Sequence, residues 1–397
     1  MAVGRRSTVS VATPPSRQRF RPAWAEIDLD AIAANATILA GMAVPAGLCA
    51  VVKADGYGHG AVPVARAARR GGATWLGVAL VEEGIELRDA GMDGPILVLS
   101  EPTREAMAEV VAQDLTPTLY TAAGVEAVAA EVLLSGRQGP FAVQVKVDTG
   151  MHRVGAAPDA AVALALEVAG RAELELGGFW THFAVADEID DPYTAGQMER
   201  FEAASARLRA GGVVPPLRHA ANSAGTLWHP GARLDLVRCG IALYGLAPAA
   251  TGVGAPEMDG LRPALSLRAR VAHVKTVAAG ERLSYGLRYR LEAPSVVATV
   301  PIGYADGVPR SLAAAGGEVL LGGRRRPLAG TVTMDQILVD CGPEAGAGVA
   351  VGDDVVLLGA QGDEHIGAWE WADLTGTISY EIVCGLSPRV PRIYLGS

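Results

Sequence analysis

A short apolar segment followed by a turn and a helix recurs eight times between residues 48 and 243, and this repeat limits the folds open to the chain. Apolar segments of about four to eight residues are typical of strands buried on both faces, and helices between them make such strands parallel. The eight units favour a closed (β/α)8 barrel over an open sheet. The predicted strands are Leu48–Lys53, Trp75–Val81, Ile96–Ser100, Thr116–Tyr120, Phe141–Val147, Leu176–His182, Leu217–Ala221 and Leu236–Leu243.

Helical patterns separate these strands. A further strand and a helix are predicted before Leu48. Residues 24–29 alternate apolar and polar side chains, which predicts a further strand. Asp30 follows this segment and is placed to cap the next helix. The predicted helices include Ala31–Ala40, Ala61–Arg70, Thr103–Val111, Gly124–Leu134 and Asp159–Val168.

The rhythm changes after residue 247, where a second domain is predicted. Residues 248–263 are rich in Ala, Gly and Pro and read as a linker. Short alternating strands with Gly-rich turns and few helices then indicate a mostly β C-terminal domain over residues 264–397. The barrel takes residues 23–247, its strand at 23–29 can pair with the C-terminal domain, and residues 1–22 are expected to be a disordered tail. The clearest C-terminal strands are Leu267–Val277, Ser295–Val300, Glu318–Leu321, Gln336–Asp340 and Asp354–Leu358.

Composition argues against several classes of function. The net charge of −9 and the lack of a face rich in Lys and Arg argue against a nucleic-acid partner. No segment approaches the roughly 18 uninterrupted apolar residues of a membrane-spanning helix. The histidines lack metal-binding spacing such as HExxH, so we expect no metal. The four cysteines form no CxxC pair, which favours reduced thiols in a cytoplasmic protein.

The stretch from Leu48 to Gly60 carries the strongest chemical signal. Lys53 ends a buried strand beside a glycine-rich turn, where desolvation can neutralise the amine so that it attacks a carbonyl and forms a Schiff base. The pattern Gly56-x-Gly58-x-x-Ala61, with Glu82 roughly 20 residues further on, also fits a dinucleotide-binding fingerprint. A strand-turn-helix corner with a surface lysine is the third interpretation, and this stretch alone does not decide among them.

Polar side chains at the other strand ends favour the lysine chemistry. In barrels of this kind catalytic groups lie at the carboxyl ends of the strands, and the loops after strands seven and eight commonly hold a phosphate. Ser223 and Gly240–Ile241 fall in these two loops. Only three of the 34 basic residues are lysines, namely Lys53, Lys146 and Lys275. A phosphate-bearing cofactor beside a strand-end lysine suggests pyridoxal phosphate and weakens the dinucleotide interpretation. The polar strand-end residues are Lys53, Tyr57, Lys146, Asp148, Arg153, His182, Asn222, Ser223, Arg238, Cys239 and Gly240.

An ordered set of motifs resembles the alanine racemases from about residue 23 to the end of the chain. The matching motifs are Val52-Lys-Ala-Asp-Gly-Tyr-Gly-His-Gly60, Lys146-Val-Asp-Thr-Gly-Met-His-Arg153, Thr181-His-Phe-Ala184, Asn222-Ser-Ala224, Arg238-Cys-Gly-Ile-Ala-Leu-Tyr-Gly245, Ser284-Tyr-Gly286, Ile302-Gly-Tyr-Ala-Asp-Gly307, Met334-Asp-Gln336 and Ser379-Tyr-Glu381. The resemblance implies a pyridoxal 5'-phosphate enzyme that interconverts L- and D-alanine and supplies D-alanine for peptidoglycan. It also implies a cytoplasmic homodimer with shared active sites.

Two alternatives share this fold. One is a racemase with broader substrate range or a preference for serine. The other is a pyridoxal-phosphate-dependent amino-acid decarboxylase, which is less favoured because such enzymes place an acid against the pyridine nitrogen, where this chain has Arg238.

The resemblance implies a role for each matching residue. Lys53 carries the cofactor as a Schiff base and is one base, Tyr285 is the second base on the opposite face, and His182 lies behind the pair. Arg238 faces the pyridine nitrogen of the cofactor. The residues that hold the phosphate are Tyr57, Ser223, Gly240, Ile241 and Tyr380. The substrate side is formed by Arg153, Met334, Asp335 and Tyr304, with Lys146, which is carbamylated in relatives, positioning Arg153. Thr333 stands where many relatives have cysteine.

Overall fold

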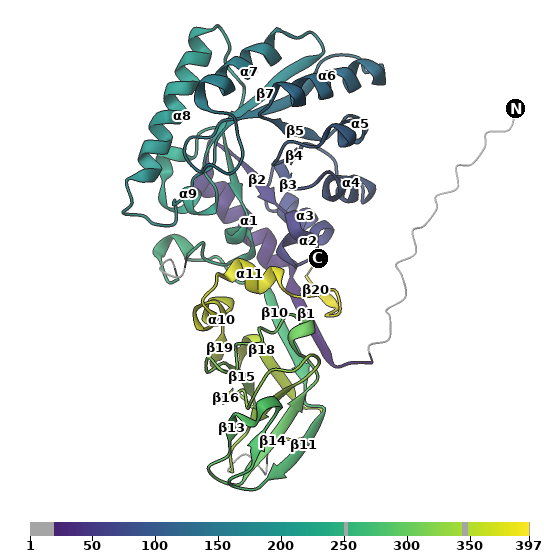
Figure 1. The fold of residues 1–397 in the computed structure, drawn as a ribbon, viewed down its shortest axis with the longest axis vertical. Helices are drawn as coiled ribbons and strands as arrows, with labels where there is room; N and C mark the ends of the chain where they lie inside the picture. The colour runs from purple at the N-terminus through teal and green to yellow at the C-terminus, as the bar shows by residue number, and fades with distance from the viewer. Residues whose placement is uncertain (1–19, 250–252, 344–347, 397) are drawn as a thin grey trace, which may run out of the picture.

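The computed structural model describes residues 20–249, 253–343 and 348–396. A barrel covered by helices and a β-rich domain are stacked along the long axis of the molecule (Figure 1). The tail expected to be disordered, residues 1–22, lies outside the described residues up to position 19, as do positions 250–252 of the expected linker. The expectation is wrong for residues 21 and 22: Arg21 pairs with Asp306 at 2.8 Å, and the carbonyl of Pro22 accepts a hydrogen bond from Arg270 N at 2.9 Å. No helix of the described segments is long and apolar enough to cross a membrane.

Eight parallel strands form the barrel, in the order β8-β7-β6-β5-β4-β3-β2-β9. β9 pairs with β2, and hydrogen bonds from Asp235 N to Arg218 O and from Arg238 N to Ala221 O join it to the β8 side. The sheet therefore closes, which confirms the predicted barrel and excludes the open sheet of a dinucleotide-binding domain. The strands are β2 (Gly47–Val51), β3 (Trp75–Val78), β4 (Ile96–Val98), β5 (Thr116–Leu119), β6 (Phe141–Lys146), β7 (Leu174–Trp180), β8 (Arg218–His219) and β9 (Leu236–Cys239).

Helices follow the strands and cover the outside of the barrel (Figure 1). They are α1 (Leu29–Ala43), α3 (Ala61–Arg70), α4 (Val81–Asp89), α5 (Met107–Ala112), α6 (Ala122–Ser135), α7 (Pro158–Gly170), α8 (Tyr193–Ala210) and α9 (Ser223–Trp228), with 3₁₀ turns η1 (Arg104–Ala106), η2 (Pro230–Ala232) and η3 (Ile241–Tyr244). The predicted cap at Asp30 is wrong: the carboxylate of Asp28 accepts a hydrogen bond from Ala31 N at 2.8 Å. The helix starts at Leu29, so Asp30 lies in its first turn.

The C-terminal part is mostly β and contains two short helices. Its largest sheet has the order β16-β15-β18-β10-β1-β20, with β19 paired to β18. The segment predicted as one strand, Leu267–Val277, is two strands in different sheets, because the chain turns away between Arg270 and His273. The large sheet contains β1 (Ala23–Asp28), β10 (Leu265–Arg270), β15 (Glu318–Leu321), β16 (Arg325–Pro327), β18 (Asp354–Gln361), β19 (Glu364–Ile366) and β20 (Arg392–Leu395). The remaining elements are β11 (His273–Val277), β14 (Ser295–Val300) and β17 (Ile337–Asp340) in a second sheet, the hairpin β12 (Arg282–Leu283) and β13 (Tyr289–Arg290), 3₁₀ turns η5 (Pro256–Met258), η6 (Tyr285–Leu287) and η7 (Tyr304–Asp306), and helices α10 (Ala368–Thr375) and α11 (Ser379–Cys384).

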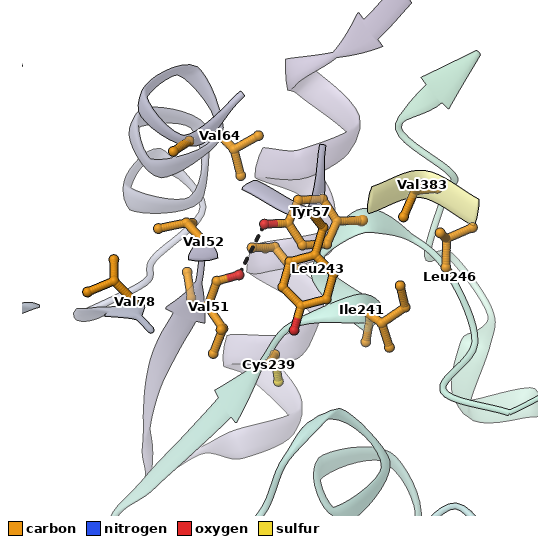
Figure 2. Packing of buried hydrophobic residues seen from close by; sticks show 14 of the residues in the cluster. Val51, Val52, Tyr57, Val64, Val78, Cys239, Ile241, Leu243, Leu246 and Val383 are labelled. Carbon is orange, nitrogen blue, oxygen red and sulfur yellow. Dashed lines mark hydrogen bonds between the residues drawn. The ribbon is translucent and has the colours of Figure 1, made fainter. Parts of the chain in front are cut away.

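β1 and β20, the first and last strands of the described residues, connect the two parts of the molecule. β1 lies between β10 and β20, antiparallel to the former and parallel to the latter. One continuous cluster of buried side chains extends from the barrel into the large C-terminal sheet. Figure 2 shows the cluster where the barrel meets α11. Its labelled residues include Val51 at the end of β2, Val52 after it, Tyr57, Ile241, Leu243, and Val383 of α11. The C-terminal domain is thereby fixed against the carboxyl end of β2, where Lys53 lies.

Candidate active site

Lys53 opens a left-handed turn at the carboxyl end of β2. The four residues from Ala54 to Tyr57 have φ between 51° and 60°. This conformation costs about 1–3 kcal/mol for each residue other than glycine, and strain of this kind clusters at functional sites. Two carboxylates hold the turn: Glu83 Oε1 accepts from Ala54 N at 2.6 Å, and Asp55 Oδ1 accepts from Ala61 N at 2.9 Å. The glycine-rich turn and the helix from Ala61 are found as predicted.

The surroundings of Lys53 favour its neutral amine. Burial lowers the pKa of Lys53 below the usual lysine value, and the Arg153 guanidinium lowers it further. Glu83 opposes these effects as a nearby negative charge. A neutral amine at a strand end can act as a nucleophile or accept a proton.

Arg238, the last but one residue of β9, lies in the wall of the same site and is fixed there by hydrogen bonds. Its Nη1 lies 2.6 Å from Nδ1 of His219, and its Nη2 donates to the carbonyls of Thr181 and Ala220 at 2.8 and 3.0 Å. Nη2 also lies 3.2 Å from Nδ1 of His182. Burial lowers the pKa of Arg238 to about 10, so the side chain keeps its charge at neutral pH. The site thus contains a fixed cation that is 3% exposed.

A group of hydroxyls and backbone amides lies beside this cation. Ser223 Oγ accepts hydrogen bonds from Gly240 N at 3.0 Å and Ala242 N at 3.3 Å, which joins the loops after β8 and β9. A Cβ on Gly240 would lie 2.3 Å from the Tyr57 hydroxyl, so only glycine leaves room there. The Tyr380 ring of α11 lies 6.1 Å from the Tyr57 ring. The hydroxyls of Ser223, Tyr57 and Tyr380 line one cavity and are donors that fit a phosphate group. With Lys53 and Arg238 they fit pyridoxal 5'-phosphate.

β6 and the loop after it contribute two more basic side chains, Lys146 and Arg153. Asp148 Oδ1 accepts from the amides of residues 150, 151 and 152 at 2.9, 3.0 and 3.1 Å, and so fixes the loop that carries Arg153. Lys146 is buried, with Nζ 4.5 Å from the centre of the Trp180 ring. Burial, followed by Arg238 and Arg153, lowers the pKa of Lys146 to about 7.

The structure collects these residues around one cavity of about 560 Å³. The predicted site residues that line it are Lys53, Tyr57, Lys146, Arg153, His182, Ser223, Arg238, Gly240, Ile241 and Tyr380. Sequence reasoning missed Trp180 and Cys384, which also line it. Trp180 ends β7 and was signalled by its position two residues before His182, whereas Cys384 lies in a segment without a clear pattern.

Four predicted residues lie elsewhere. Tyr285, Tyr304, Met334 and Asp335 line a second cavity of about 600 Å³ in the C-terminal domain. Tyr285 is 75% exposed, and β13, which follows it, lies in the lower half of Figure 1, away from the barrel. Within one chain the structure therefore does not bring Tyr285 to Lys53.

The second group is nevertheless held in a defined arrangement. Thr331 Oγ1 donates to Tyr285 O at 2.8 Å, and Tyr304 N donates to Thr333 O at 2.9 Å. Ser284 and Leu287, on either side of the Tyr285 turn, have φ of 61° and 49°. Backbone conformations of this kind cluster at functional sites. No group of three or more potential metal ligands occurs within residues 20–249, 253–343 and 348–396.

Comparisons with known proteins match both parts of the chain to one family. Residues 27–248 match the family described as alanine racemase, N-terminal domain, and residues 264–394 match its C-terminal domain. The alanine racemase of Symbiobacterium thermophilum is 49% identical over 95% of this chain and 98% of its own length. That of Thermobifida fusca is 45% identical over 94% and 98%. The crystal structure of alanine racemase from Streptomyces lavendulae has a TM-score of 0.89 and 42% identity, covering 96% of this chain and 98% of its own. The Bacillus anthracis structure, with bound L-Ala-P, has a TM-score of 0.86 and 39% identity, covering 96% of each chain.

Proposed function

Because the chain belongs to the alanine racemase family and has its activity, we propose that it interconverts L- and D-alanine with two bases and pyridoxal 5'-phosphate. The observation that carries this proposal is the cavity in which Lys53 and the phosphate-binding hydroxyls lie beside Arg238. When bound, the cofactor would supply an electron sink that acidifies the Cα–H bond of the amino acid. All other requirements of the reaction fall on the residues of this chain.

Lys53 is the proposed base on one face of the substrate. Its burial and the nearby Arg153 favour the neutral amine, which can take the Cα proton and return it. Arg153 is proposed to bind the substrate carboxylate. Asp148 fixes the loop that carries Arg153, and this keeps the guanidinium in place. His182, whose pKa burial lowers well below the usual value, is neutral and keeps a polar contact behind the reacting groups.

Arg238 is proposed to face the pyridine nitrogen of the cofactor. A permanent cation there disfavours protonation of that nitrogen and limits how much negative charge moves into the ring. Charge that stays near Cα favours fast return of a proton to Cα, which is the step that racemisation requires. The same residue disfavours the decarboxylase alternative, which needs an acid at this position.

The second base is proposed to be Tyr285 of another copy of the chain. Removal of a proton from one face and its return to the other require bases on opposite faces, yet the second cavity with its exposed Tyr285 lies apart from Lys53. A homodimer in which the C-terminal domain of each chain approaches the barrel of the other would complete both sites. Tyr304, Met334 and Asp335 would then line the substrate side, and the two tyrosines leave space for a methyl-sized side chain.

Lys146 is proposed to carry a carbamate. Its neutral amine would add to carbon dioxide, forming an N–C bond and releasing one proton. Arg238 and Arg153 both act on this position as cations. An anionic carbamate would compensate their charge and position Arg153.

We further propose that the enzyme acts in the cytoplasm and supplies D-alanine for peptidoglycan. Four free cysteines, three of them buried, support a reducing compartment. The activity itself is tested by incubating the purified holoenzyme with L-alanine and with L-serine and separating the enantiomers by chiral chromatography. We expect D-alanine to form much faster than D-serine. Equal rates would favour the broad-specificity alternative, and release of carbon dioxide would favour the decarboxylase.

A further inference from the structure

One buried side chain outside the candidate active site binds two of the loops that form it. Gln197 is fully buried and belongs to α8, which lies on the outside of the barrel (Figure 1). Its Oε1 accepts a hydrogen bond from Ala184 N at 2.9 Å, and its Nε2 donates to His182 O at 3.1 Å and to Thr149 Oγ1 at 3.3 Å. The amide thus uses its oxygen and both N–H groups on the loops after β6 and β7.

The main chain after β7 determines the orientation of this amide. Ala184 N can only donate and His182 O can only accept, so the oxygen of Gln197 faces the former and its nitrogen faces the latter. A reversed amide would bring two donors together at Ala184 N and two acceptors together at His182 O. Gln197 therefore holds the main chain on both sides of Phe183. It thereby fixes the direction in which the His182 side chain leaves the loop, with Nδ1 3.2 Å from Nη2 of Arg238.

The third hydrogen bond of Gln197 reaches the loop that carries Arg153. Thr149 Oγ1 also lies 2.7 Å from Thr181 Oγ1, and both threonines are buried. Thr149 directly precedes the three amides that the Asp148 carboxylate binds. Arg153 is exposed and lines the active-site cavity, so the backbone of this loop decides where its guanidinium lies.

Two neighbours of Gln197 on α8 hold the same loop. Tyr193 and Arg200 are four residues before it and three after it, so all three share one face of the helix. The Tyr193 hydroxyl donates to Gly150 O at 2.8 Å, and Arg200 Nε donates to Thr149 O at 2.6 Å. A Cβ on Gly150 would lie 2.5 Å from the Tyr193 hydroxyl, so α8 packs directly on the loop. Gln197 adds the connection from this loop to His182.

Arg153 and His182 consequently depend on one side chain that lies behind both of them. The described residues that line the active-site cavity include Arg153 and His182, but neither Gln197 nor Thr149. A displacement of about 1 Å that originates outside a site can cost about 100-fold in rate. The hydrogen bonds of Gln197 resist such a displacement of the two loops relative to each other.

We propose that Gln197 is a positioning residue, which holds Arg153 and His182 at a fixed spacing through the loops after β6 and β7. This inference rests on the proposed function, in which Arg153 binds the substrate carboxylate. Loss of Gln197 weakens carboxylate binding and slows turnover, although its side chain does not line the cavity in which the substrate would bind.

The test measures carboxylate binding separately from turnover. Propionate has the carboxylate and the methyl group of alanine but no amine, and saturation-transfer NMR of the holoenzyme gives its Kd. Gln197→Met keeps the length of the side chain and removes its three hydrogen bonds. Propionate should bind about fivefold more weakly, which corresponds to about one hydrogen bond, and kcat for alanine should fall about tenfold or more. An unchanged Kd for propionate would overturn the proposal, whatever the change in kcat.

Ser205→Ala is the matched control on the same helix. Ser205 is buried in α8, and its Oγ donates to Phe201 O at 2.9 Å within that helix. Loss of this bond removes a buried polar group of α8 without touching either loop, so the propionate Kd and kcat should stay as they are. Equal weakening of propionate binding by Ser205→Ala and Gln197→Met would show a general loss of structure and overturn the positioning role.

Thr149→Val supplies a second variant, which carries the test if Gln197→Met does not fold. It removes the hydroxyl that Gln197 Nε2 contacts and retains the two bonds from Gln197 to the main chain after β7. Propionate binding should weaken as in Gln197→Met, while kcat should fall less, because His182 is still held. Propionate binding that is unaltered in folded Thr149→Val protein would overturn the proposed route to Arg153.

Arg153→Gln separates this inference from the proposed function. Loss of a charged hydrogen-bonding partner should weaken propionate binding about tenfold or more. In the Arg153→Gln background, Gln197→Met should weaken it little further, because two residues that act through one contact are not additive. Unchanged propionate affinity in Arg153→Gln would reject the carboxylate-binding role in the proposed function. Additive losses in the double variant would reject the positioning role of Gln197 alone.

Discussion

Nδ1 of His219 lies 2.6 Å from Nη1 of Arg238, and this contact fixes the tautomer of the histidine. A guanidinium only donates hydrogen bonds, so Nδ1 accepts and the ring proton is on Nε2. Nε2 in turn donates a hydrogen bond to Gln144 Oε1 at 2.8 Å. Burial, followed by Arg238, lowers the pKa of His219 well below its usual value. A neutral histidine thus anchors the buried cation of the site.

Replacing His219 by Phe should leave Nη1 of Arg238 without this acceptor. We expect the free energy of unfolding to fall by about 1–3 kcal/mol, the cost of an unsatisfied buried donor. Urea denaturation at a fixed protein concentration measures the loss. The exposed His365 offers a matched control, since His365→Phe removes no contact to a buried charge. Equal stability of the two variants would contradict the anchoring role.

Two substitutions around Lys53 should move the acid limb of the kcat profile in opposite directions. Lys53 must be neutral to accept a proton, so activity falls as pH drops through its pKa in the complex. Arg153→Gln removes a charge that lowers this pKa, so the acid limb should move to higher pH. Glu83→Gln removes a charge that raises it, so the limb should move to lower pH, while the amide oxygen can still accept from Ala54 N. Profiles of kcat for the three proteins decide this, and shifts of the same sign would refute the assignment of Lys53 as the titrating base.

Lys146 should take up carbon dioxide as its amine becomes neutral. Because its pKa is lowered to about 7, the neutral fraction rises as pH increases through that value. Protein equilibrated with ¹³C-bicarbonate should give one carbamate signal in the ¹³C spectrum that grows between pH 6 and pH 8, a window centred on about 7. Lys146→Arg should lose the signal, and Lys275→Arg should keep it. A signal that persists in Lys146→Arg would place the modification elsewhere.

Lys53→Ala should abolish the visible absorbance of the bound cofactor and reduce racemisation more than about 100-fold, the lower range for loss of an acid–base group. Lys275→Ala, in β11 of the C-terminal domain, is the control and should retain both properties. Borohydride treatment followed by peptide mapping identifies the attachment site. A reduced adduct on Lys146 or Lys275 in the Lys53→Ala protein would disprove the assignment.

Mixed dimers test whether each site is built from two chains. Lys53→Ala and Tyr285→Phe are each expected to be inactive alone. In a mixed dimer one site would combine an intact Lys53 with an intact Tyr285 from the other chain, and the second site would carry both defects. Random exchange at equal concentrations makes half of the dimers mixed, so about a quarter of the unaltered activity should return. Size measurements on differently tagged chains must verify exchange, and with exchange verified, an inactive mixture would show that both residues come from one chain.

The barrel was predictable because its strands and helices have strong local patterns. Phe141–Lys146 is an almost uninterrupted apolar strand, and Ala61–Arg70 follows a glycine turn, so both were found nearly to the residue. The strand predicted as Trp75–Val81 ends at Val78 because apolar Val81 begins α4. Apolar residues at the junction of two elements suit either one, so periodicity does not locate the boundary.

The parts that depend on distant contacts were not predictable in the same way. Asp28 and Asp30 are both good caps, and the choice of Asp28 follows from where β1 ends in its sheet. Trp180 belongs to the site because the guanidinium of Arg238 lies over its ring, with Cζ 4.5 Å from the ring centre. The two residues are on strands far apart in the sequence, so no local pattern signals this contact. The separation of Tyr285 from Lys53 within one chain has no local signal at all, because it is a property of how two domains are connected.

The position of β1 has a consequence for how the polypeptide is made. β1, the first strand of residues 20–249, 253–343 and 348–396, lies between β10 and β20, and β20 ends at Leu395. β20 can join the C-terminal sheet only after residues 392–395 have been synthesised, and by then the barrel, which lies between β1 and β10 in the sequence, has already been made. A gene fragment starting at residue 264 would encode a sheet without one of its inner strands. The two domains are consequently not interchangeable modules, and a functional transplant of the C-terminal domain would have to carry residues 23–28 with it.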